Sequence, residues 1–214
     1  MPIVVTPPEP TQFYVPTVDI SPYLADPTSA EAGKIIADVR AACISTGFFQ
    51  ITGHGIPRSL QKDVFDAAAA YFALPYDEKK KLDAKTTIGH RGYDVLASQS
   101  YEADVLPDLK ENPGLEVLDT NSNEFVPIAP NPDAYVVNVG SMLSKWTRNE
   151  YKSSVHRVIN RNPGDRYSVV FFFDGNLDCR LSPLDGQGEK EGEEVLTVEG
   201  HMLKRMRESY GGKK

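Results

Sequence analysis

The spacing of apolar residues predicts two helices and two short strands in the first half of the chain. Apolar side chains recur every three or four residues over 30–45 and again over 57–74, which is typical of one face of an amphipathic helix. Runs of β-forming residues at 18–20 and 47–51 precede these helices and are expected to be strands. Strand and helix alternate in this region, so the pattern predicts an α/β layer.

Beyond residue 112 the pattern changes to short runs of β-branched and aromatic residues. Strands are expected at 115–118, 134–139, 153–158 and 167–173. The polar cluster at 119–123 is typical of a hairpin turn. A closing helix is expected over 198–210, with Met202, Leu203 and Met206 facing inward. The second half is therefore predicted to be mainly antiparallel β.

Two other segments carry little apolar surface. Residues 1–16 contain five prolines, which disfavour both helix and central strand and predict an extended arm. Residues 77–85 are dominated by lysine and acidic side chains, and are interpreted as the solvated surface of a helix.

Length, charge and cysteine content limit the classes of function. A chain of 214 residues with 40% hydrophobic residues is long enough for one domain with its own core. A net charge of -7 disfavours binding to nucleic acid or to anionic lipid. Neither a membrane span nor a signal-peptide pattern is found. Cys43 and Cys179 are far apart, which is typical of a reducing compartment, so a cytoplasmic location is expected.

Candidate chemistry lies in the last two expected strands. Arg166 and Ser168 are two residues apart, so on a strand they project from the same face. An arginine fork pairs with a carboxylate and a neighbouring hydroxyl adds a hydrogen bond, which suits one end of a dicarboxylate. His156 is a possible metal ligand, because neutral imidazole binds metals when other ligands converge on it. Taken singly, an exposed polar pair and a structural histidine are the commoner interpretations.

In combination these residues resemble a known motif. The stretches YKSSVHRVIN (151–160) and GDRYSVVFFF (164–173) resemble the C-terminal barrel motif of Fe(II)/2-oxoglutarate-dependent oxygenases, in the branch that includes isopenicillin N synthase. Further similar stretches follow in order: VPTVDI (15–20), GFFQITGHGIP (47–57), RGY (91–93), PDLKE (107–111) and PGLEV (113–117). The resemblance implies that His156 binds Fe(II) and that Arg166 and Ser168 hold the far carboxylate of 2-oxoglutarate.

The chain departs from this family at the other two iron ligands. The family binds Fe(II) with two histidines and one carboxylate, of which the first two ligands form an H-x-D motif on an early barrel strand. The four histidines of this chain are followed two positions later by Ile56, Gly92, Val158 and Leu203, so H-x-D and H-x-E are both missing. His54 and His90 lie in stretches that the family uses structurally, and His201 lies on the expected closing helix. Motifs of phosphate-binding loops, serine hydrolases and zinc proteases are also missing.

The position of the loss is indicated by the neighbouring stretches. Lys110-Glu111 resembles the segment before the family's middle helices, and Asn112-Pro113 resembles the segment after the H-x-D strand. An internal block is therefore expected to be missing at Glu111/Asn112. The resemblance then implies an incomplete double-stranded β-helix, or jelly roll, with residues 1–111 as an N-terminal α/β region and 112–214 as the remaining barrel strands and closing helix.

The expected function follows from the resemblance and from the missing ligands. The family uses Fe(II), O2 and 2-oxoglutarate to hydroxylate, desaturate or cyclise a small organic substrate, releasing succinate and CO2. This chain is expected to be impaired, because one imidazole does not hold Fe(II) tightly. The alternative is a non-catalytic shortened isoform or pseudoenzyme that acts as an interaction protein. Unpaired strand edges and exposed apolar surface are expected to favour self-association.

Overall fold

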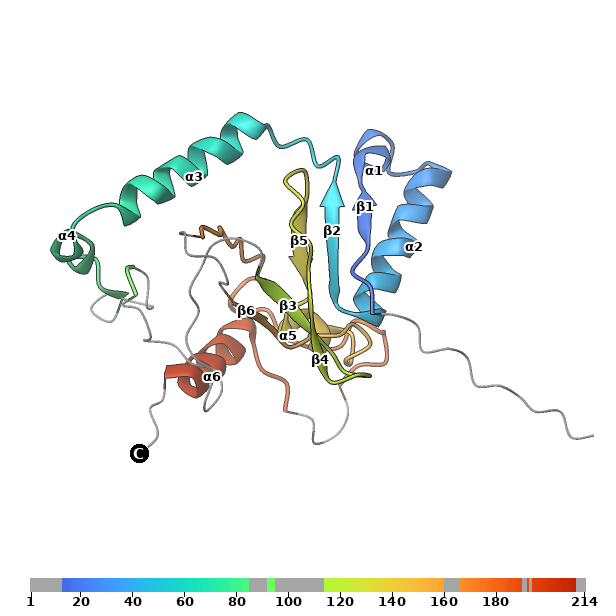
Figure 1. The fold of residues 1–214 in the computed structure, drawn as a ribbon. Helices are drawn as coiled ribbons and strands as arrows, with labels where there is room; N and C mark the ends of the chain where they lie inside the picture. The colour runs from blue at the N-terminus through green and yellow to red at the C-terminus, as the bar shows by residue number, and fades with distance from the viewer. Residues whose placement is uncertain are drawn as a thin grey trace, which may run out of the picture.

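Two three-stranded sheets organise the fold in a computed structural model that describes residues 13–84, 92–94, 114–159, 166–189, 192 and 194–210 (Figure 1). The first sheet has the order β1 (Thr17–Asp19), β2 (Phe48–Thr52), β5 (Tyr135–Asn138), and the second has the order β4 (Glu124–Pro127), β3 (Leu115–Asp119), β6 (His156–Val158). The helices are α1 (Ser21–Ala25), α2 (Ala30–Ser45), α3 (Arg58–Phe72), α4 (Tyr76–Lys80), α5 (Ser141–Trp146) and α6 (Val198–Tyr210). These elements fit an incomplete jelly roll with an added N-terminal helical layer.

The first sheet joins the two regions expected from the sequence. β2 pairs with β1 in parallel and with β5 in antiparallel, and its register places Phe48 opposite Asn138. β2 lies before the expected boundary at Glu111/Asn112 and β5 lies after it, so both regions contribute to one sheet. The division into residues 1–111 and 112–214 stays a prediction.

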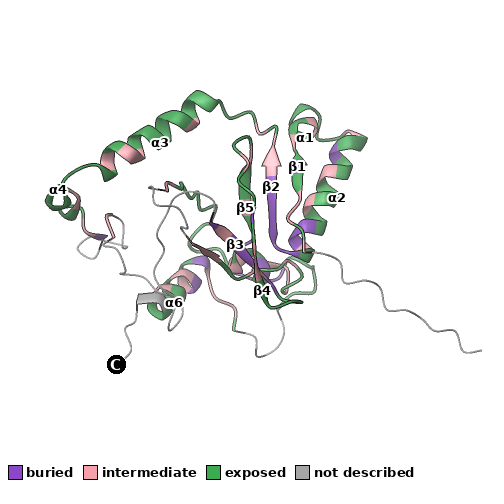
Figure 2. Cartoon of the chain, in the orientation of Figure 1, coloured by how far each residue is buried: buried purple, intermediate pink, exposed green. Residues whose placement is uncertain are grey.

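β2 is the centre of the core because both of its faces are covered. Phe49 packs with Ala42 and Cys43 of α2 and with Val139. Phe48 points to the opposite side and packs with Val117 of the second sheet and with Ile128. Figure 2 shows this concentration of buried residues on β2, α2 and β3, whereas α3 and α4 are largely exposed. The core therefore has three layers: α2, the first sheet and the second sheet.

The connection from α2 to β2 requires a glycine. Gly47 has φ of 68°, in the left-handed region that residues with a Cβ rarely adopt. A Cβ at this position would lie 1.9 Å from the backbone carbonyl oxygen of Lys152. The glycine therefore ends α2 and lets the chain pass close to the segment that leads into β6.

Several sequence predictions are confirmed by these elements. The helix over 30–45 has the expected bounds, and the predicted turn at 119–123 joins β3 to β4. In that turn the carboxylate of Asp119 accepts hydrogen bonds from the backbone N–H of Asn121 and the hydroxyl of Ser122. These bonds, led by the one from Asn121, lower the pKa of Asp119. The arm expected over residues 1–16 lies mostly outside the described residues.

The predicted strand at 167–173 is wrong. This segment has no strand pairing, and the side chains from Val169 to Phe173 are 55% to 93% exposed. A strand forms only when a neighbour supplies the opposite half of the ladder, and in the described part of the chain no strand lies against this segment. Local β propensity alone is therefore insufficient here.

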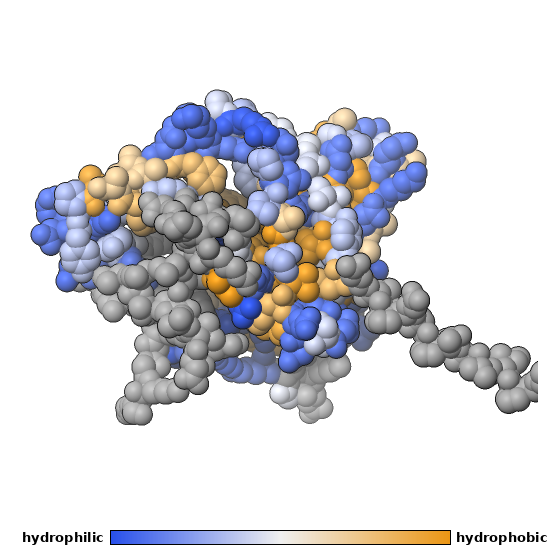
Figure 3. Space-filling view, viewed as in Figure 1, coloured by the Kyte–Doolittle hydropathy of each residue, from blue (hydrophilic) through white to orange (hydrophobic). Residues whose placement is uncertain are grey.

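The helix α3 has an apolar face that stays largely exposed. Leu60, Val64, Phe65 and Phe72 are between 41% and 53% exposed, and no residue of α3 is buried. In Figure 1 this helix extends away from the two sheets, and Figure 3 shows apolar residues along its lower side. The predicted helix is confirmed, but its apolar face does not reach the core.

The closing helix α6 is confirmed, with one correction to its inward face. Leu203 is 45% exposed, whereas His201 is only 5% exposed. The Nε2 atom of His201 lies 2.8 Å from the hydroxyl oxygen of Ser141, so this contact joins α6 to α5. Met202 and Met206 are half-buried as expected, so Leu203 is the residue that the spacing misplaced. No helix in the described ranges is both long and apolar enough to cross a membrane.

Burial of His201 predicts a dependence of stability on pH. Desolvation lowers the pKa of His201 below its usual 6.5, assisted by the nearby cations Lys145 and Arg205. The unfolded chain therefore binds a proton at a higher pH than the folded chain, so the stability that His201 contributes is present above pH 6.5 and falls as the pH drops below it. Urea unfolding at about pH 7.5 and about pH 5.5 measures this loss. His201→Gln should show a smaller loss over the same interval, and an equal loss would contradict the assignment to His201.

Candidate cosubstrate and metal site

His156 begins the edge strand β6 and is oriented as a metal ligand would be. Its Nδ1 atom lies 3.1 Å from the backbone carbonyl oxygen of Ser154, and because a carbonyl only accepts, the Nδ1–H group donates this hydrogen bond. The lone pair of the imidazole is then on Nε2. Metal-bound histidines usually donate their second nitrogen to a carbonyl or carboxylate in this way. The described geometry therefore fits ligation through Nε2 of His156.

The ring of His156 is held by the core. It meets the ring of Phe48 edge-on, with 5.2 Å between the ring centroids. Phe48 belongs to β2 in the first sheet, so this contact ties the candidate ligand to the centre of the fold. The sequence alone did not indicate this contact, because residues 48 and 156 lie on separate elements far apart in the chain.

A partly buried ion pair fixes β6 beside β3. The backbone register places Arg157 opposite Glu116, and Arg157 Nε donates a hydrogen bond of 2.8 Å to Glu116 Oε2. The side chain of Glu116 is 2% exposed, and the guanidinium of Arg157 also lies 3.8 Å from the ring centroid of Phe125. A one-residue slip of β6 would separate this pair. The pair therefore holds His156, the adjacent residue, on its own side of the strand.

Arg166 and Ser168 do not share a strand face in the structure. Arg166 is half-buried and Ser168 is exposed, and the backbone at both positions is outside any strand. Among the described residues, His156 makes its polar and ring contacts with Ser154 and Phe48 rather than with this pair. The structure therefore shows no contact between His156 and the pair Arg166 and Ser168 among the described residues. The roles of these three residues stay predictions.

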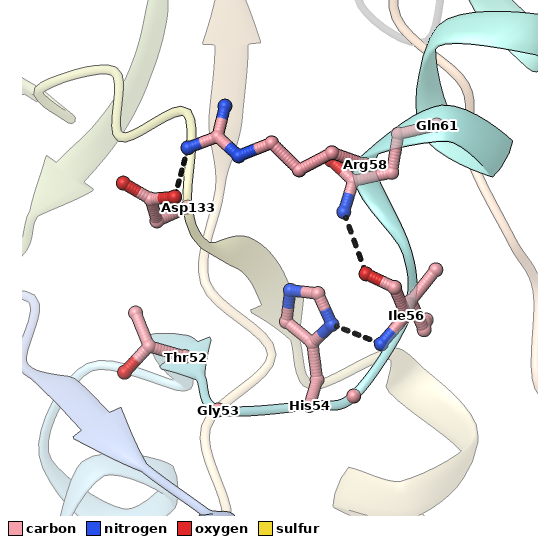
Figure 4. A pocket seen from close by; sticks show the side chains of 8 residues that line it. Thr52, Gly53, His54, Ile56, Arg58, Gln61 and Asp133 are labelled. Atoms are coloured by element: carbon pink, nitrogen blue, oxygen red, sulfur yellow. Dashed lines mark hydrogen bonds and ion pairs between the residues drawn. The ribbon is translucent and has the colours of Figure 1, made fainter.

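Two cavities lie elsewhere on the described surface. One, of about 210 Å³, is lined by residues near His54, Arg58 and Asp133 (Figure 4). The other, of about 690 Å³, lies between α2, β1 and the β3–β4 turn. Neither is lined by His156, Arg166 or Ser168, so neither is the expected oxygenase pocket.

His54 lines the small cavity and makes structural contacts there. In Figure 4 the ring of His54 faces Ile56, whose backbone N–H donates a hydrogen bond of 3.1 Å to His54 Nδ1. The ring also meets Tyr135 edge-on at 4.5 Å between centroids. Arg58 forms an ion pair with Asp133 across the same cavity. His54 therefore stabilises a turn and its contact with β5, as expected for a structural histidine.

The described residues do not form a three-ligand iron site. No group of three or more histidine, cysteine, aspartate or glutamate side chains within the described ranges is placed to hold a metal ion. His201 is buried against Ser141, and His90, Asp104 and Asp108 lie outside the described residues. His156 thus fits Fe(II) as a single ligand, but the donor set around it does not complete the triad.

Comparison with known proteins identifies the family. Residues 15–131, more than half of the chain, match the family described as non-haem dioxygenase in morphine synthesis, N-terminal. The chain is 38% identical to the 2-oxoglutarate-dependent dioxygenase citB of Monascus ruber, with 94% of this chain and 97% of the relative covered. It is 33% identical to the clavatol oxidase claD of Penicillium crustosum, with 92% and 97% covered.

The length of these alignments agrees with an internal loss. The alignment to the Monascus ruber relative extends over 321 positions, whereas this chain has 214 residues, so more than a hundred aligned positions have no counterpart in it. These residues cannot all be missing from the ends, because the alignment covers nearly the whole of both proteins.

Solved structures show the same fold. A full-length Neurospora crassa protein in complex with alpha-KG superposes with a TM-score of 0.71 at 16% identity, covering 89% of this chain and 95% of that chain. The dioxygenase for auxin oxidation of rice superposes with a TM-score of 0.63 at 19% identity, covering 91% and 95%. Sequence and fold agree, and the chain belongs to the Fe(II)/2-oxoglutarate-dependent oxygenase family.

Proposed function

We propose that this chain is a shortened dioxygenase that keeps part of the cosubstrate site and has lost the ability to bind iron tightly. The observation that carries the proposal is the absence of H-x-D or H-x-E from its 214 residues, together with the single histidine, His156, that matches a family ligand. The related enzymes are 2-oxoglutarate-dependent dioxygenases, so oxidation of a small organic molecule is the activity from which the chain descends.

The missing block is proposed to lie at Glu111/Asn112. The uncovered apolar face of α3 supports this, because helices that would follow residue 111 in a complete relative are available to cover it. The exposed segment from Val169 to Phe173 supports it in the same way, since an early barrel strand is the natural neighbour of a late one. Both surfaces are what an internal loss would uncover.

Arg166 and Ser168 are proposed to keep a weak affinity for 2-oxoglutarate. The half-buried guanidinium is shielded in part from water, which strengthens its pairing with a carboxylate. Because no strand ladder holds Ser168 beside it, the hydroxyl adds little. Without iron to bind the other end of the molecule, we expect a dissociation constant near or above about 1 mM.

Ligand-observed NMR of 2-oxoglutarate tests this cosubstrate site. Loss of a charge-assisted hydrogen-bond partner removes about 1.5 to 3 kcal/mol, so Arg166→Ala should weaken binding about tenfold or more. Arg180→Ala is the matched control, because Arg180 is an exposed arginine that pairs with Glu189 at 2.8 Å. Equal binding by Arg166→Ala and the native chain would show that Arg166 has no role in cosubstrate binding.

A second candidate function, a non-catalytic interaction protein, is favoured by the exposed apolar surfaces of α3 and of residues 169–173. Contiguous apolar surface of this kind commonly marks a protein–protein contact. We propose a cytoplasmic location for either role, because Cys43 and Cys179 are free thiols, as is usual in a reducing compartment.

A further inference from the structure

Residues 166–174, here called the ribbon segment, are complementary to themselves. The segment reads Arg-Tyr-Ser-Val-Val-Phe-Phe-Phe-Asp, with a cation at one end and an anion at the other. Arg166 and Asp174 are equally distant from Val170 at the centre. An antiparallel pair of such segments centred on Val170 therefore places each Arg166 opposite an Asp174 of the other copy. We propose that two copies of this chain associate by this pairing.

The surface of the ribbon segment fits this partner. Its five central apolar side chains are 55% to 93% exposed, and no strand in the described part of the chain pairs with it. A second copy would supply hydrogen-bond partners for the backbone of the ribbon segment and would also bury its aromatic rings. A parallel pairing would set Arg166 against Arg166 and Asp174 against Asp174, which like-charge repulsion disfavours.

The two faces of the paired segments differ in polarity. Because side chains alternate along a strand, Tyr167, Val169, Phe171 and Phe173 lie on one face. That face of the dimer carries eight apolar side chains, four from each copy. The opposite face carries Ser168, Val170 and Phe172 between Arg166 and Asp174, so an ion pair lies at each end of it.

A helix already lies at the edge of the apolar face. The ring of Tyr167 is 6.1 Å from the ring of Phe72, centroid to centroid, at the end of α3. A two-stranded ribbon is only marginally stable by itself and needs a covering layer. In the proposed dimer the exposed apolar face of α3, which reaches the segment at Phe72, would provide that layer. Pairing of two copies would thus bury both surfaces that the shortened fold leaves exposed.

Disulfide crosslinking tests the register. In a Cys179→Ser background, which removes the exposed native thiol and leaves only buried Cys43, Val170→Cys places two thiols directly opposite each other. Ser168→Cys is the matched control, since its two copies would lie four residue steps apart, roughly 13 Å, beyond disulfide reach. Oxidation of the two thiols by diamide should give a covalent dimer with Val170→Cys and little with Ser168→Cys.

Charge reversal tests the pairing without crosslinks. Sedimentation of the native chain under reducing conditions should show a concentration-dependent dimer, and Asp174→Arg should weaken it about tenfold or more. Asp178→Arg, the same change at an exposed position outside the segment, should leave it unchanged. The double variant Arg166→Asp/Asp174→Arg restores opposite charges and should restore the dimer.

Three outcomes would overturn the proposal. A native chain that stays monomeric at about 0.1 mM excludes it, since the pairing is then too weak to matter. Equal crosslinking by Val170→Cys and Ser168→Cys shows unspecific association. Equal weakening by Asp174→Arg and Asp178→Arg shows that net charge, and not the pair with Arg166, controls self-association.

Discussion

Succinate formation from 2-oxoglutarate by this chain is expected to be no faster than that by its own His156→Ala variant. Two missing iron ligands remove the fixed position at which Fe(II) acts, and a bound metal contributes several kcal/mol to such reactions. The rate should therefore lie at least about a thousandfold below that of a complete relative. The assay supplies Fe(II), 2-oxoglutarate and O2, and uses the Monascus ruber relative as the positive control.

The comparison with His156→Ala makes this test decisive. Succinate formed by iron free in solution is the same for both proteins, so it cancels. Turnover by the native chain that disappears in His156→Ala would contradict the proposed loss of function and would show that other residues complete the site. Robust turnover would leave the family assignment intact, because that rests on sequence and fold.

The same prediction has a gain-of-function counterpart. Insertion of the corresponding segment of the Monascus ruber relative between Glu111 and Asn112 should restore H-x-D, the middle helices and the early strands together. Succinate formation should then rise well above the native level and should again depend on His156. Insertion at another exposed loop, such as after Gly186, is the control and should restore nothing.

Phe48→Ala is expected to destabilise the fold by about 3 to 5 kcal/mol, the usual effect of removing a buried phenylalanine ring. Phe48 is 1% exposed and lies between the two sheets, so the resulting cavity would separate β2 from Val117 and Ile128. The ring of His156 would also lose its edge-on contact with Phe48. Urea unfolding measures the first effect, and the chemical shifts of the His156 ring measure the second.

Phe65→Ala is the matched control for this substitution. Phe65 is 43% exposed on α3, and alanine favours helix, so the expected loss is less than about 1 kcal/mol. A similar loss for both variants would mean that the core is not centred on β2. An unchanged His156 spectrum in Phe48→Ala would mean that the core does not position the histidine.

The sequence predicted the elements with strong local signals and missed the short elements α1, β4 and α5. Periodicity located α2 with its bounds, and turn residues located the β3–β4 hairpin, because local spacing carries both signals. It failed at 167–173, where the residues favour a strand but no strand in the described ranges lies beside them. Leu203 was misplaced because spacing identifies an apolar face, whereas packing against α5 selects His201.

The sequence predicted which residues belong to the candidate site, but it did not predict how they are positioned in space. His156, Arg166 and Ser168 follow from a motif, and the absence of H-x-D follows from reading the four histidines. Motifs do not report long-range packing, so the contact with Phe48 and the ion pair of Arg157 with Glu116 came only from the structure. Both depend on strand register, which is set by the whole sheet.

The pairing of β2 with β5 has a consequence for how the shortened chain folds. Phe48 pairs with Asn138, about 90 positions later, and closing a ladder over that separation is a slow, non-local step. With the missing residues placed at Glu111/Asn112, the same loop in a complete relative is roughly twice as long, and each doubling of a loop costs about 0.6 kcal/mol in closure entropy. Shortening therefore eases the nucleation of the first sheet, even as it removes the strands that would have enclosed the iron.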